Sequence, residues 1–102
     1  MTFEDAIREL ERYRIRIDDV DRRIVKLLNE RTRVVEEIGK VKREARLPIY
    51  EPKREDQVFR NVTESNQGPL TPEALKRVFE RIIDEMRTVQ RVRMESDGDR
   101  QC

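Results

Sequence analysis

Apolar residues recur with a helical period along the first 45 residues of the chain. The positions spaced at intervals of three and four are Leu10, Tyr13, Ile17, Val20, Ile24, Leu27, Arg31, Val34, Ile38, Val41 and Ala45. This spacing is typical of a helix that packs along its whole length against other helices. Thr2 is a suitable N-cap, no proline interrupts the segment, and Pro48 follows it. The pattern predicts one helix from about Thr2 to about Ala45, with Gly39 as its weak point.

This predicted helix is long for a chain of 102 residues. At 1.5 Å per residue it would extend roughly 65 Å, about twice the diameter of a small domain. A single chain of this size cannot cover both ends of such a helix. The pattern therefore predicts a partner that packs along it.

Two shorter helical stretches follow. The second helix begins at Glu51-Pro52, with proline at the first helical position, and ends near Gly68-Pro69. The third begins with Thr71 as N-cap and ends near Met94. Their apolar stripes are Val58, Phe59 and Val62 in the second helix and Leu75, Val78, Phe79, Ile82, Ile83, Met86 and Val89 in the third, a line that Gln90 continues. The sequence thus predicts an all-α fold with three helices per chain, and one domain over residues 1–95. Residues 96–102 carry no apolar side chain apart from Cys102, and we expect a disordered tail there.

Composition narrows the classes of function. Lys and Arg number 23 and Asp and Glu 22, so 44% of the residues are charged while the formal net charge is only +1. The two signs are interleaved, which leaves no continuous basic stripe and argues against nucleic-acid binding. A mean hydropathy of -0.93 argues against a membrane span and an apolar signal peptide. We expect a cytoplasmic protein with no membrane contact.

The chain contains no histidine. This absence excludes Ser-His-Asp and Cys-His catalysis and the usual histidine metal sites. Cys102 is the single cysteine, so it forms no internal disulfide, and its polar surroundings do not suit a nucleophile. We expect neither a metal nor another cofactor, and any chemistry must depend on charge and position.

Four polar residues interrupt the apolar stripes: Arg31, Lys42, Glu55 and Gln90. Arg31 and Lys42 point the same way, because eleven residues return a helix to within about 20° of its starting direction. Burying two unpaired cations costs several kcal/mol, so the pattern indicates either acidic partners or an anionic ligand. The alternative is structural: long cationic side chains reach water at the edge of a stripe, and Glu55 pairs with Arg31 or Lys42.

With these residues in view, the sequence resembles the helical class of chorismate mutases from about Leu10 to Gln90. The matching pieces are Arg14-x-x-Ile17-x-x-x-Asp21, Leu28-Asn-Glu30-Arg31, Ile38-Gly39-Lys40-Val41-Lys42, Pro48-x-x-Glu51-Pro52-x-Arg54-Glu55 and Gln90. The resemblance implies an intertwined all-α homodimer in which the long first helices of two subunits pair. Arg14 lies roughly 42 Å from Lys42 along a straight helix, too far to share one site within a chain. In the family, the arginine that matches Arg14 reaches the pocket of the other subunit.

The reaction implied by the resemblance is the pericyclic isomerisation of chorismate to prephenate in phenylalanine and tyrosine biosynthesis. This reaction needs no acid, base, nucleophile or metal. The enzyme holds a flexible dicarboxylate in its reactive shape and stabilises charge on the ether oxygen. Positioning and electrostatics must together supply at least about 8 kcal/mol to reach the low end of enzymatic rate enhancement.

The resemblance also assigns roles to cations and an amide. Arg14 of the partner subunit, Arg31 and Arg54 would bind the two substrate carboxylates, a task suited to guanidinium groups, which form paired hydrogen bonds and stay charged. Arg31, Lys42 and Gln90 are the expected catalytic residues. Lys42 and Gln90 would donate to the ether oxygen, where the contribution grows in the transition state. For Arg54 the alternative is a solvated position on the second helix.

Two carboxylates and one apolar residue complete the expected site. Glu55 would bind the ring hydroxyl and could orient a neighbouring cation. Glu51 either shares the hydroxyl contact or places a negative charge at the start of the second helix. Met86 stands where some relatives have a small hydroxyl residue that touches a carboxylate, so we expect that contact to be missing or replaced.

Two other functions fit the same residues. The first is a weakly active, mutase-like regulatory domain that docks on another enzyme of the shikimate pathway. The second is a purely structural helical dimer, which would neither bind nor be stabilised by a transition-state analogue.

Overall fold

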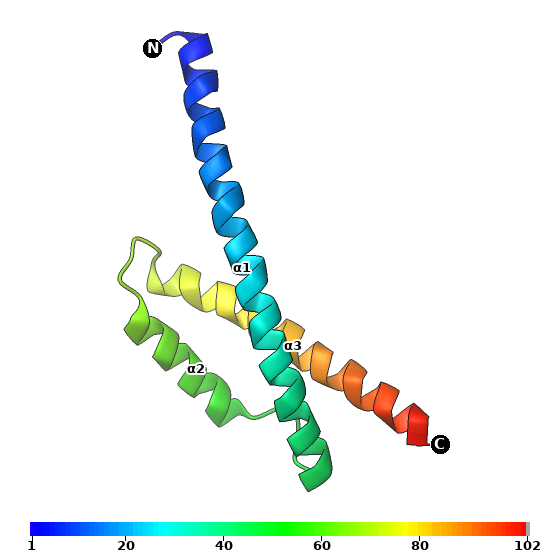
Figure 1. The fold of residues 1–102 in the computed structure, drawn as a ribbon. Coiled ribbons are helices and arrows are strands. Elements are labelled where there is room, and N and C mark those ends of the chain that lie inside the picture. The colour runs from blue at the N-terminus through cyan, green and yellow to red at the C-terminus, as the bar shows by residue number, and fades with distance from the viewer. Residues whose placement is uncertain (102) are drawn as a thin grey trace. The chain divides into compact units, whose positions relative to one another are not determined.

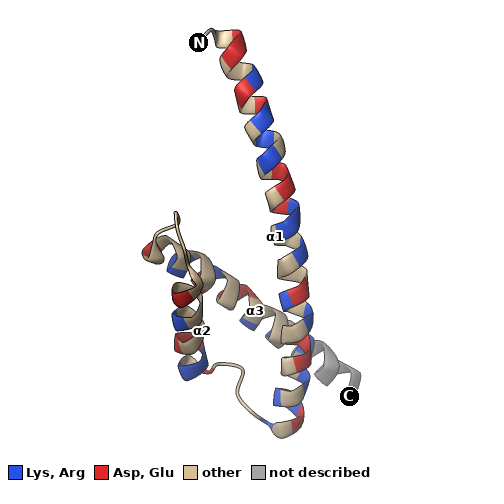
Figure 2. Ribbon diagram, turned by 60° about the vertical axis from the view of Figure 1, so that its left-hand side comes forward, with Lys and Arg blue, Asp and Glu red and all other residues tan. Residues whose placement is uncertain are grey.

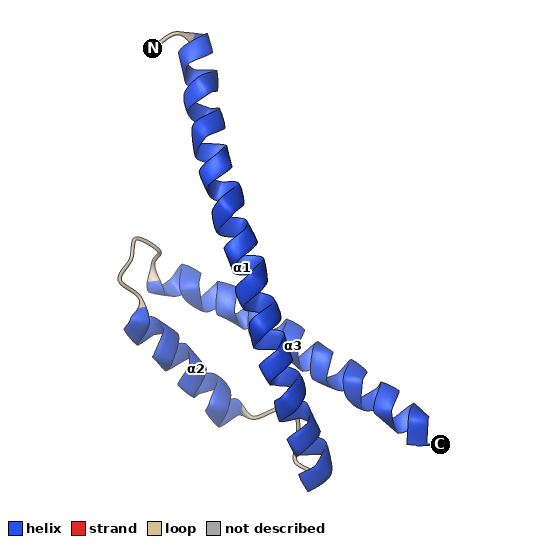
Figure 3. Ribbon diagram, in the orientation of Figure 1, coloured by secondary structure: helices blue, strands red, loops and turns tan. Residues whose placement is uncertain are grey.

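Three helices make up the fold, in a computed structural model that describes residues 1–101 (Figure 1). They are α1 (Phe3–Ala45), α2 (Pro52–Ser65) and α3 (Pro72–Gln101). No strand occurs within residues 1–101 (Figure 3). The all-α prediction with a very long first helix is therefore confirmed, and α1 comprises 43 residues. None of the helices, over the residues described, is long and apolar enough to cross a membrane.

The third helix differs from its prediction at one end. The backbone of α3 runs to Gln101, past the expected end near Met94, because no proline follows to stop the helix. The side chains of residues 94–101 and the whole of Cys102 lie outside the described residues. The side chains of the predicted disordered tail, 96–102, are among them, so that prediction is not tested.

The chain divides into two compact units, Met1–Arg33 and Val34–Cys102. The first unit consists of the N-terminal part of α1. Its start is capped as predicted: the Thr2 hydroxyl accepts a hydrogen bond from the Asp5 amide at 3.1 Å, and the Asp5 carboxylate accepts one from the Thr2 amide at 3.3 Å. Hydrogen bonds from Arg8 and Thr2 lower the pKa of the Asp5 carboxyl.

Side chains of the first unit are almost all exposed. Lys, Arg, Asp and Glu are interleaved along α1 (Figure 2). The apolar stripe is exposed as well, and its members in this unit are Leu10, Tyr13, Ile17, Val20, Ile24 and Leu27. A helix in a protein gains most of its stability when such a stripe packs against another element. The first unit is therefore a helix whose apolar face has no cover from its own residues.

The second unit contains the end of α1 together with α2 and α3. Among its described residues the buried side chains are Val35, Ile83, Met86 and Gln90, and Gly39 of α1 is also buried. Helices α2 and α3 pack against each other. Most residues of their predicted stripes are half-buried or buried, whereas Val78 is half exposed. Val78 lies on the edge of the stripe, about 80° from Met86 around the helix.

Local signals set the helix boundaries of the second unit. The amide of Leu47 donates to the Lys42 carbonyl at 2.7 Å and that of Arg46 donates to the Arg43 carbonyl at 3.2 Å, a Schellman motif that ends α1. Arg46 takes the left-handed position of this motif, with φ of 57°. The Thr71 hydroxyl accepts a hydrogen bond from the Ala74 amide at 3.2 Å, which confirms the predicted N-cap of α3.

Candidate active site

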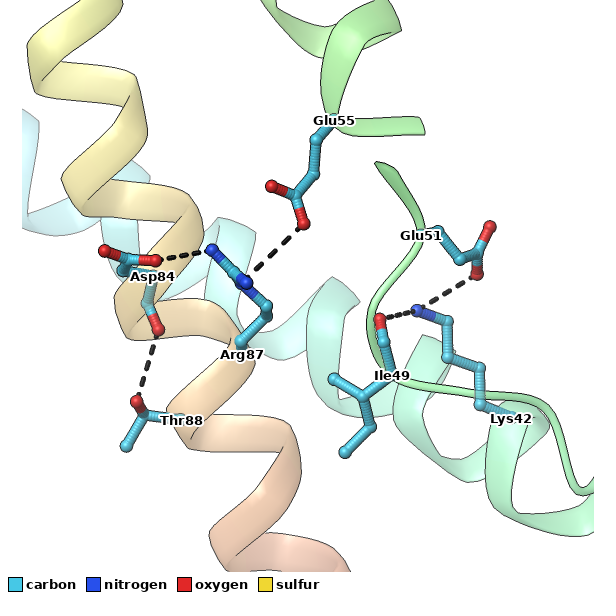
Figure 4. Close-up of polar contacts among 7 residues, drawn as sticks. All are labelled: Lys42, Ile49, Glu51, Glu55, Asp84, Arg87 and Thr88. Atoms are coloured by element: carbon cyan, nitrogen blue, oxygen red, sulfur yellow. Dashed lines mark hydrogen bonds and ion pairs between the residues drawn. The ribbon is translucent and has the colours of Figure 1, made fainter. Parts of the chain in front are cut away.

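Lys42 is fixed where the chain turns back from α1. The Schellman motif reverses the backbone, so residues 46–51 return past the Lys42 side chain. Its ammonium group donates to the Ile49 carbonyl at 2.9 Å and forms an ion pair with Glu51 at 3.1 Å (Figure 4). The side chain is only 12% exposed. An ammonium group has three N–H donors, so one remains for a ligand.

Glu51 occupies the N-cap position of α2 but forms no side-chain capping hydrogen bond. Its carboxylate binds Lys42 instead. The side chain therefore serves as the acidic partner of a nearly buried cation, a role that the sequence analysis considered for Glu55 and not for Glu51.

Gln90 is a buried polar residue of α3, with 7% of its surface exposed. A Cβ placed on Gly39 would lie 3.5 Å from Cγ of Gln90, so the glycine brings α1 and α3 into close approach here. Lys42 follows Gly39 by one turn, which places it on a neighbouring part of the same helix face. The Oε1 atom of Gln90 is buried without a hydrogen-bond partner among the described residues. Leaving such an atom unpaired costs about 1–3 kcal/mol.

Glu55 lies on α2 and faces a cation of α3. Its carboxylate is 3.7 Å from Nε of Arg87, and the Glu55 side chain is 21% exposed. Arg87 also donates from Nη2 to Asp84 at 2.5 Å, and its guanidinium lies 5.3 Å from the centre of the Tyr50 ring. Figure 4 shows Arg87 between Asp84 and Glu55.

Arg87 is a site residue that the apolar pattern does not single out. It lies four residues after Ile83 and three before Gln90, so it is adjacent to both on the helix surface. A cation at the edge of an apolar stripe is the available signal. Because the chain has 23 basic residues, this signal does not distinguish Arg87 from the other cations until the fold is known.

The remaining predicted residues are placed as follows. Met86 is buried in the second unit. Arg54 is exposed and donates to Gln57 of its own helix at 2.8 Å, as expected for a solvated helix position. Arg14 and Arg31 belong to the first unit, and Arg14 is exposed while Arg31 is half-buried. The contribution of Arg14, Arg31 and Arg54 to the site stays a prediction.

Metal binding would require several Asp, Glu, His or Cys side chains close together. Over the residues that the structure describes, no group of three or more Asp, Glu, His or Cys side chains is arranged to hold a metal ion. The polar groups that the second unit brings together are an ammonium, two carboxylates, a guanidinium and an amide. This set suits recognition of an anionic, hydroxylated ligand by hydrogen bonds and charge.

Three helices with such a polar cluster agree with the resemblance to helical chorismate mutases, and the comparison with known families supports it. Residues 13–91 match the family described as chorismate mutase type II. The chain belongs to this family.

Curated relatives align with this chain over about 80 residues. The chain is 38% identical over 79 residues to a bifunctional chorismate mutase/prephenate dehydratase from Aquifex aeolicus, an alignment that covers 74% of this chain and 22% of that protein. The chain therefore spans about a fifth of the length of the curated relatives that it matches first.

Solved structures match the helical arrangement. A chorismate mutase from Thermus thermophilus superposes with a TM-score of 0.79 and 35% identity, covering 81% of this chain and 94% of that one. A chorismate mutase from Helicobacter pylori in complex with prephenate has a TM-score of 0.78 and 28% identity, covering 84% of this chain and 93% of that one.

Proposed function

We propose that this chain is a chorismate mutase, which isomerises chorismate to prephenate. The observation that carries the proposal is the buried amide of Gln90, whose oxygen lacks a partner among the described residues. It lies against the same helix face as Lys42, whose ammonium group keeps one free donor. An unpaired buried polar group lowers the stability of the fold by about 1–3 kcal/mol, and a ligand that pairs with this group would offset that cost.

Lys42 and Gln90 have the chemistry to stabilise the transition state. Bond breaking leaves negative charge on the ether oxygen of chorismate, and both side chains can donate to that oxygen. Rotation of the Gln90 amide by half a turn presents its NH₂ group in place of Oε1. Because Glu51 and Ile49 already hold Lys42, little reorganisation is needed as the charge grows.

Glu51 and Glu55 take separate roles in this proposal. Glu51 orients Lys42, to which it is bound at 3.1 Å. Glu55 has no hydrogen bond to Arg87 at a separation of 3.7 Å, so its oxygens are open to accept the ring hydroxyl of the substrate. Met86, buried one turn before Gln90, supplies an apolar contact to the ring.

The substrate carboxylates require further cations. We propose that Arg31, Arg54 and Arg14 of the partner subunit bind them, as the family resemblance implies. The exposed apolar stripe of the first unit supports a homodimer, since pairing of two first helices would bury it. The site then draws on both chains. A cytoplasmic location stays a prediction from composition.

The test is a direct assay. Chorismate absorbance is followed with purified protein at micromolar concentration, and prephenate is identified by its acid conversion to phenylpyruvate. The proposal expects consumption far above the spontaneous rate, with prephenate as the product. Consumption at the spontaneous rate would contradict it and leave the two alternatives: a regulatory domain that is weakly active without its partner enzyme, and a purely structural helical dimer.

A further inference from the structure

Arg87 is a partly buried cation of the second unit that the proposed function has not used. Its side chain is 30% exposed, and three groups surround it. Asp84 accepts a hydrogen bond from Nη2 at 2.5 Å, the Tyr50 ring lies under the guanidinium at 5.3 Å, and Glu55 faces Nε. These contacts come from one turn earlier on α3, from the loop after α1 and from α2.

The contact with Glu55 differs from the other two. Nε of Arg87 is buried and has no hydrogen-bond partner within the described part of the chain. The Glu55 oxygen lies 3.7 Å away, beyond hydrogen-bond distance but within reach of charge attraction at a partly buried site. Arg87 therefore attracts the Glu55 carboxylate without occupying its acceptor positions.

Asp84 and Tyr50 hold Arg87 from other sides. A guanidinium group that is hydrogen-bonded at one edge and stacked on an aromatic ring has little freedom to leave. A restrained cation keeps the carboxylate that it faces in one orientation. This arrangement is what a hydroxyl-binding carboxylate needs, since a misplaced acceptor would lose its hydrogen bond to the substrate.

We propose that Arg87 is a positioning residue of the mutase site, which aims the Glu55 carboxylate at the substrate ring hydroxyl, while Asp84 and Tyr50 hold Arg87. The inference rests on the proposed function, and in particular on Glu55 as the hydroxyl acceptor. Arg87 itself touches neither substrate nor reacting atoms. Its effect reaches the substrate only through Glu55.

A double-mutant cycle between Arg87→Met and Glu55→Gln tests this proposal. Methionine keeps the apolar stem of the side chain and removes the charge. Because the hydroxyl contact exists in both ground and transition states, Arg87→Met should raise KM about fivefold to tenfold and leave kcat within about twofold. In the Glu55→Gln background the same change should alter KM by less than about twofold, since the carboxylate to be aimed is gone.

Two further variants separate positioning from packing. Arg87→Lys keeps the charge and should recover part of the affinity that Arg87→Met loses, whereas a packing role predicts that the methionine variant performs as well or better. Arg81→Met removes an exposed arginine of the same helix, whose ion pair with Glu85 lies in solvent, and should leave KM and kcat unchanged. If Arg87→Met fails to fold, Arg87→Lys replaces it in the cycle.

The outcomes are distinct. An Arg87→Met loss of equal size with and without Glu55→Gln overturns the inference and leaves the proposed function standing. A fall in kcat with KM unchanged also overturns it, because it would place Arg87 at the reacting atoms. A wild-type protein without mutase activity removes the proposed function, and this inference with it.

Discussion

The two units of the chain differ in how far their apolar stripes are exposed. In the second unit the apolar stripes of α2 and α3 are mostly half-buried or buried, and Ile83 and Met86 are buried. The stripe of α1 is exposed instead, both in the first unit, where Ile17 is 58% exposed, and at its end in the second unit, where Val41 is 61% exposed. Periodicity alone thus predicts that a face is to be buried, and the chain length available decides whether the cover comes from the same chain.

The residues of the proposed active site are also divided between the two units. The second unit assembles Lys42, Glu51, Glu55, Arg87 and Gln90 from a single chain. The first unit carries Arg14 on a helix without cover from its own residues. In the proposed enzyme, a partner chain completes both the first unit and the site. Variants in each unit test whether the two differ in this way.

The largest effect is expected from a charge on the exposed stripe of the first unit. Ile17→Lys should convert the proposed dimer to monomers and lower activity at least about 100-fold, because a lysine facing the partner must be buried without a counter-charge. Analytical ultracentrifugation and the chorismate assay measure the two effects. Ile15→Lys is the matched control: Ile15 is 60% exposed and lies on the opposite side of the helix. If the Ile17→Lys protein remains as dimeric and active as the Ile15→Lys protein, the stripe of the first unit is not the dimer interface.

The next effect concerns the amide of the second unit. Gln90→Ala should lower kcat about 100-fold to 1000-fold, as expected for the loss of one preorganised donor to a developing oxyanion. Thermal stability should change little, since the variant also removes a buried oxygen without a partner among the described residues. Val89→Ala on the same helix should show the reverse: a lower melting temperature and a nearly unchanged kcat. Parallel losses of stability and activity in Gln90→Ala would assign the residue to packing.

The smallest effect is on stability alone. Arg46 has φ of 57° at the end of α1, and a non-glycine residue in this conformation costs about 1 kcal/mol. Arg46→Gly should raise the melting temperature by roughly 4 °C at fixed protein concentration. Glu44→Gly, two residues earlier and within the helix, should lower it by a similar amount. Equal destabilisation by both would contradict the Schellman assignment.

The starts of α1 and α3 and the polar core residues are predictable from local chemistry. Thr2 and Thr71 cap their helices as expected because a short hydroxyl side chain satisfies a free amide wherever a helix begins. The departures of Lys42 and Gln90 from the apolar pattern correctly indicate side chains that are nearly buried.

Pairing between helices is not predictable in the same way. Lys42 pairs with Glu51 rather than Glu55, because the Schellman motif turns the loop back on the end of α1. Arg87 reaches Glu55 because of the approach of α2 to α3, which no local spacing encodes. Val78 belongs to the predicted stripe and is half exposed, because the width of a buried stripe depends on what packs against it.

The central claim is that each site combines the second unit of one chain with Arg14 of the partner subunit, and mixed dimers test it directly. Arg14→Ala and Gln90→Ala proteins are each assayed alone and after refolding together from denaturant. Mixed dimers would contain one site with both residues intact, so the account predicts recovery to about a quarter of wild-type activity from two nearly inactive proteins. If Arg14 serves its own chain, every site in the mixture lacks one residue. Activity that stays at the level of the separate variants would contradict the claim.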